Sequence, residues 1–143
     1  MRYKKLLSEI KAAFQRFNPP ENIYSESGSF SEVSSASQRI QKEFHGKKRE
    51  DLTTEECAIL IFENGTISDK AYYYFLPRLA QAVFTEGADE FLFYSHIEKM
   101  SFSLLDDNQK KVINKLIKAL KEIERALETE EEKELKKFNS DLD

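Results

Sequence analysis

Three side chains of this 143-residue chain could supply a nucleophile or a general base: the single cysteine, Cys57, and two histidines, His45 and His96. Cys57 lies in the apolar run 57–62, where a buried thiol keeps its proton and is a poor nucleophile. A zinc site needs several ligands at close spacing, such as two histidines four residues apart, and the sequence holds no such group. We therefore expect neither a bound metal nor a cofactor. We also expect both histidines to be structural or exposed.

Adjacent acidic residues could act as general acid and base, and such pairs occur at 55–56, 89–90 and 106–107. Each pair lies where a helix is expected to begin, and carboxylates there cap free N–H groups or complement the helix dipole. The chain has four glycines and neither a G-x-x-x-x-G-K-[ST] nor a G-x-G-x-x-G segment, which disfavours a phosphate-binding loop. These observations predict a protein that is not an enzyme. The alternative is a site assembled from distant residues that depends on His96 or Cys57.

The composition predicts a globular, helix-rich, cytoplasmic protein. Hydrophobic residues make up 40% and charged residues 34% of a chain that is long enough for one domain with a real core. A single cysteine cannot form an intramolecular disulfide, which fits a reducing compartment. No secretory apolar run follows the basic N-terminus, and no stretch of eighteen apolar residues could span a membrane.

Apolar residues recur every three to four positions, which predicts an all-α fold of five or six helices in one domain. The run 57–62 follows a capping box at Thr53–Glu56. Its sequence fits two structures: a buried helix, or one strand of a hairpin that turns at Asn64-Gly65. Pro77 should kink or restart the helix that contains it, and the Ser-rich stretch 21–35 is expected to be a mobile loop. The other expected helices are about 2–17, 36–45, 68–84, 89–100 and 106–127.

The long C-terminal helix carries an apolar stripe whose spacing alternates three and four, as in a coiled-coil seam. The stripe runs for barely two heptads, so we expect it to pack on its own domain, residues 1–127. Dimerisation through this helix is the alternative, and a charge at Leu120 would test it. Residues 128–143 form an acidic segment that is either a helix extension or a frayed tail. The stripe consists of Ile113, Leu116, Leu120, Ile123 and Leu127.

Four consecutive aromatic residues, 72–75, sweep more than one face of their helix, so they should not all point inward. We expect Tyr72 and Phe75 to be buried, and Tyr73 or Tyr74 to be half exposed with its hydroxyl in water. An exposed tyrosine at this place could anchor a protein interface, where tyrosine is enriched.

The segment Ser68–Pro77 resembles an uncharacterised family of small bacterial helical proteins with the signature S-P-E-A-F-R-Y-Y-L-P. Asp69 and Lys70 stand at the Pro-Glu positions, Tyr73 at the Arg and Phe75 at the second Tyr. The likeness covers residues 52–123 and implies a helical bacterial domain of the accessory or immunity type, with no activity to carry over. The coinciding positions are Ala71, Tyr74, Leu76 and Pro77.

The net charge of −4 is concentrated in residues 128–143, which hold seven acids against three lysines. An acidic surface disfavours nucleic acid and suits a basic protein partner, and neither a membrane nor a small molecule is expected as a ligand. The leading prediction is a non-catalytic inhibitor, similar to a bacterial immunity protein that neutralises a basic, nuclease-type toxin by direct binding. The alternative is a structural or adaptor module that self-associates. The predicted partner-binding residues are Tyr73, Asp89, Glu90, Glu130, Glu131 and Glu132.

Overall fold

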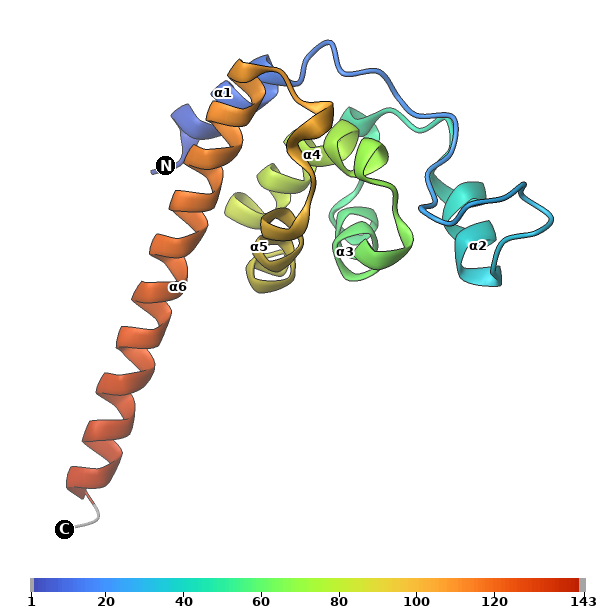
Figure 1. Ribbon diagram of the computed structural model, residues 1–143. Coiled ribbons are helices and arrows are strands. Elements are labelled where there is room, and N and C mark those ends of the chain that lie inside the picture. Colours follow the sequence, from blue (N-terminus) through green and yellow to red (C-terminus); the bar gives the residue numbers. More distant parts are fainter. Residues whose placement is uncertain (1, 142–143) are drawn as a thin grey trace.

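The computed structural model describes residues 2–141 and is all-α, as predicted (Figure 1). Within these residues no strand occurs, and one isolated bridge joins Tyr24 to Ile67. Three short 3-10 helices connect the longer elements: η1 (Arg49–Asp51), η2 (Asn64–Thr66) and η3 (Phe102–Leu104). The α-helices are α1 (Lys4–Ala13), α2 (Ser35–Phe44), α3 (Thr54–Phe62), α4 (Asp69–Thr85), α5 (Glu90–Lys99) and α6 (Asp107–Asp141).

Helix α4 is the centre of the hydrophobic core. Ten of its 17 residues are buried, and the six consecutive residues 71–76 among them lie all around the helix rather than on one stripe. A helical stretch that is apolar on every side must be covered on every side. Accordingly α1, α3, α5 and η1 all contact α4, and Figure 1 shows it between the α1–α6 pair and α3.

The expectation that Tyr73 or Tyr74 is half exposed is wrong, because all four aromatic residues of 72–75 are buried. The Tyr73 ring stacks on Phe14 of α1 with a centroid distance of 6.0 Å, and its hydroxyl donates to the Ser101 carbonyl at 2.9 Å. The Arg49 guanidinium lies 5.0 Å from the centroid of the Tyr74 ring. Segments distant in the sequence thus cover the faces that we expected to be open.

The predicted helix starts are confirmed by their hydrogen bonds. Thr53 and Glu56 form the reciprocal capping box of α3, and Ser68 accepts from the Ala71 N–H at 3.1 Å at the start of α4. Asp106 accepts from the Gln109 N–H at 2.7 Å at the start of α6. These side chains satisfy N–H groups that have no partner within the helix.

Two alternatives in the middle of the chain are decided by the structure. The run 57–62 belongs to helix α3, and Asn64-Gly65 lies in η2 rather than in a hairpin. Pro77 does not restart its helix, since α4 is one element from Asp69 to Thr85. The first helix is shorter than the expected 2–17 and covers Lys4–Ala13.

The Ser-rich stretch has no regular secondary structure before α2, but its end is held by one carboxylate. Glu26 accepts hydrogen bonds from the Ser34 N–H and from the hydroxyls of Ser34 and Ser37. These bonds lower the pKa of Glu26. The stretch is therefore connected to the first turn of α2.

Helix α6 is continuous to Asp141, so the acidic segment after Leu127 is a helix extension as far as the structure describes it. Only its first half packs on α1 and α5. Leu120 is 2% exposed within its own domain, so a charge there would damage the core instead of reporting on dimerisation. Among the helices of residues 2–141, none is both long and apolar enough to cross a membrane.

Truncation of Tyr73 tests its burial. We expect Tyr73→Ala to lower the free energy of unfolding by about 3–5 kcal/mol, since it removes a large core side chain. Tyr73→Phe, which removes only the hydroxyl bonded to Ser101, should cost about 1 kcal/mol. Urea unfolding followed by circular dichroism measures both, with Tyr3→Phe, whose hydroxyl has no hydrogen bond within the described residues, as a control expected within about 0.5 kcal/mol of the wild type. Wild-type stability of Tyr73→Ala would contradict the burial.

Candidate functional site

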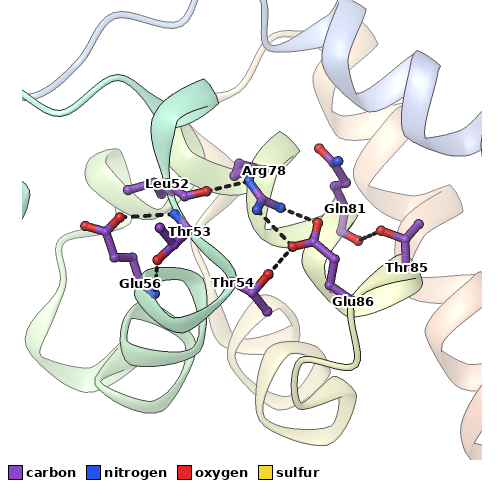
Figure 2. A network of polar contacts seen from close by, with 8 residues as sticks. All are labelled: Leu52, Thr53, Thr54, Glu56, Arg78, Gln81, Thr85 and Glu86. Carbon is purple, nitrogen blue, oxygen red and sulfur yellow. Dashed lines mark hydrogen bonds and ion pairs between the residues drawn. The ribbon is translucent and has the colours of Figure 1, made fainter.

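A polar cluster centred on Arg78 and Glu86 joins the start of α3 to the end of α4 (Figure 2). The Arg78 guanidinium donates to both carboxylate oxygens of Glu86, at 2.6 and 2.9 Å, and to the Leu52 carbonyl at 3.0 Å. The Thr54 hydroxyl also donates to Glu86. The bond from Arg78 lowers the pKa of Glu86, and that from Thr54 lowers it further. Because each charge has its partner, this cluster stabilises the fold.

Cys57 lies near this cluster, and its surroundings keep the thiol protonated. The side chain is fully buried, and burial raises its pKa to about 11, against the opposing effect of the Arg78 charge. A thiol with such a pKa is almost entirely neutral at pH 7, and the thiolate is the nucleophilic form. Its environment is that of a core residue.

His96 and Tyr72 bring two polar atoms into the core without a partner. Their rings meet edge to face with centroids 4.5 Å apart. Neither the His96 Nε2 nor the Tyr72 hydroxyl has a hydrogen-bond partner among the described residues. Burial lowers the pKa of His96; Lys99 lowers it further, while Asp69 opposes the shift. The imidazole is therefore held in its neutral form near pH 7.

The described residues contain no group of three or more His, Cys, Asp or Glu side chains placed to hold a metal ion. Cys57 packs in the core around α4, and the His96 ring packs against Tyr72 of the same helix.

The most unusual surface is the distal segment of α6, residues 126–141. Every side chain from 126 to 140 is exposed, and Figure 1 shows this part of the helix extending away from the other elements. Large apolar side chains are nevertheless present: Leu127 is 44% exposed, and Leu135 and Phe138 are each 61% exposed. Phe62 and Phe91 are exposed to a similar degree, but the apolar side chains of the distal segment lie on a helix that projects from the other elements, which makes this segment the candidate contact surface.

The predicted acidic residues lie on two elements. Glu130, Glu131 and Glu132 are exposed on the distal segment. Asp89 is exposed and caps α5, accepting from the Leu92 N–H at 3.0 Å, and Glu90 is half-buried in the first turn of α5. The structure shows no contact between these two groups of acids. Tyr73, the sixth predicted residue, is buried and cannot serve as an exposed anchor.

One polar contact on α5, close to a charge of α6, escaped the sequence reasoning. The Tyr94 hydroxyl donates to Glu98 at 2.6 Å, and Glu98 together with burial and the nearby Glu124 of α6 raises the pKa of Tyr94 to about 12. The four-residue spacing of Tyr94 and Glu98 on one helix face was the available signal. Acids of α5 and α6 thus converge just before the distal segment begins.

Comparisons with known proteins add no relative: the chain matches no protein-family model, no curated protein and no solved structure. The resemblance of Ser68–Pro77 to a bacterial family stays a prediction. The distal segment of α6 is the candidate site because exposed apolar side chains and acidic residues lie together on it.

The neutral state of His96 predicts a pH dependence of stability. Its pKa is lowered from the ordinary 6.5, so the unfolded chain binds this proton more readily than the folded one. Stability is therefore complete above about pH 6.5 and falls as the pH drops below it. Urea midpoints between pH 7.5 and 5 should decline for the wild type and stay flatter for His96→Leu. An equally steep decline in the variant would contradict this assignment.

Proposed function

We propose that this protein is a non-catalytic inhibitor of a basic protein, most like a bacterial immunity protein that neutralises a nuclease-type toxin by binding it. The observation that carries the proposal is the distal segment of α6, which is helical, exposed and acidic, and which presents apolar side chains to solvent. Residues 126–141 hold six acids against three lysines.

Charge complementarity supplies the physical reason. A nuclease binds phosphates through a positively charged surface, and an acidic helix can cover such a surface. Opposite charges also raise the rate of association. The distal segment is about 24 Å long as a helix, enough to lie across an active-site cleft.

The apolar side chains of the distal segment take the anchoring role first assigned to Tyr73. Leu127, Leu135 and Phe138 share one helix face, and buried apolar anchors carry most of the energy of many interfaces. Glu130, Glu131 and Glu132 lie around this face as the charged part of the same surface. Asp89 and Glu90 add charge from α5.

Charge reversal of the distal segment tests the proposal. The tagged wild-type chain and Glu130→Lys/Glu131→Lys/Glu132→Lys serve as parallel baits in a lysate of the source cells. We expect the wild type to retain a basic protein that is toxic when expressed alone and is neutralised by co-expression. The reversed variant should lose at least about tenfold in affinity at low salt and less at high salt.

A matched control carries the same change in net charge elsewhere: Glu21→Lys/Glu32→Lys/Asp51→Lys alters three exposed acids outside α5 and α6. This variant should bind and neutralise nearly as well as the wild type. Equal neutralisation by both variants, at low and at high salt, would contradict the proposed site. Failure to find any toxic partner would contradict the inhibitor function.

A further inference from the structure

A groove between α1 and α4 has the opposite charge from the distal segment of α6. Its volume is about 530 Å³, and η1 closes one side. Four cationic side chains line it against one carboxylate, Glu50. Part of its lining is apolar, including Leu7 and Pro77. The cationic residues are Lys4, Lys11, Arg49 and Arg78.

The four cations differ in how far they are already neutralised. Arg78 is paired with Glu86, and Arg49 donates to the Tyr74 carbonyl at 3.0 Å and the Gln15 carbonyl at 3.0 Å. Lys4 and Lys11 are exposed and form no ion pair within residues 2–141. The groove therefore presents two free ammonium groups about 10 Å apart along α1, with Leu7 between them.

Residues 124–131 of α6, in which Glu124 is half-buried and Leu127 and Glu131 are exposed, carry the complementary pattern at the same spacing. Lys4, Leu7 and Lys11 stand at positions i, i+3 and i+7 of α1, and Glu124, Leu127 and Glu131 stand at i, i+3 and i+7 of α6. Residues so spaced share one face of a helix. Laid parallel, the two helices pair each lysine with a glutamate and Leu7 with Leu127.

We propose that the groove of one copy binds residues 124–131 of α6 from a second copy, giving a two-fold symmetric dimer. Each copy then offers one groove and one helix, so the same contact forms twice and no further copies can be added. The occupant is a second copy because α6 extends away from its own body (Figure 1), while its charge and apolar spacing match the groove. The dimer uses the same helix as the proposed inhibitor, so a basic partner would compete with it.

Sedimentation velocity of the purified chain over a range of concentrations tests the dimer without any other protein, so its failure is separate from failure of the inhibitor function. We expect a dimer in low salt that weakens as salt rises. Lys4→Glu/Lys11→Glu and Glu124→Lys/Glu131→Lys should each weaken dimerisation at least about a hundredfold, because like charges then face each other. Circular dichroism confirms that each variant is folded.

Mixing the two variants is the decisive step. In a mixed dimer the acidic groove faces the basic helix and the basic groove faces the acidic helix, so both contacts are complementary again. We expect the mixture, and the single chain that carries all four changes, to dimerise to within about tenfold of the wild type.

The control variant Lys5→Glu/Lys48→Glu makes the same change in net charge at exposed lysines outside the groove and should dimerise as the wild type does. The proposal is overturned if the wild type stays monomeric, if either double variant dimerises normally, or if the mixture stays monomeric. Loss of the dimer in the control variant would also overturn the proposal, since net charge alone would then determine whether the chain dimerises.

Discussion

The structure depends on the burial of α4, whose residues 71–76 are all buried. Ten residues of this helix are buried and four neighbouring elements contact it, while Gln81 and Thr85 stay exposed in the groove beside α1. The Arg78–Glu86 pair, the Tyr73 hydroxyl bond to Ser101 and the neutral His96 all lie where a covering element meets α4. Cys57 and His96, which suggest chemistry in the sequence, lie within or against this packing.

Helix α6 combines a buried half and an exposed half in one element. Its first half completes the core with Val112, Ile113, Leu116 and Leu120. Its distal segment continues the helix without a covering partner and keeps apolar side chains on the same side as the buried stripe. Contact with a second protein surface would bury Leu127, Leu135 and Phe138. The acidic residues among them set the charge of that surface.

Local signals in the sequence predicted the helix starts, because a capping residue acts on N–H groups three residues away. Thr53, Ser68 and Asp106 are examples. Burial of Tyr73 could not be predicted, because it depends on which distant elements cover it. The apolar spacing around Leu120, in contrast, did predict that its stripe packs on its own domain. The acids at 130–132 were found as candidates by composition. The α1–α4 groove was missed because Lys4 and Arg49 are brought together only by the tertiary fold.

Residues 126–141 extend the helix without packing on the rest of the domain, so they should contribute nothing to its stability. The most direct measurement is the urea-unfolding free energy of a chain that ends at Arg125, compared with the full chain at a concentration too low for association. We expect the two free energies of unfolding to agree within about 0.5 kcal/mol, since every side chain from 126 to 140 is exposed. A loss of more than about 2 kcal/mol would show that the segment packs on its own domain and would contradict the claim.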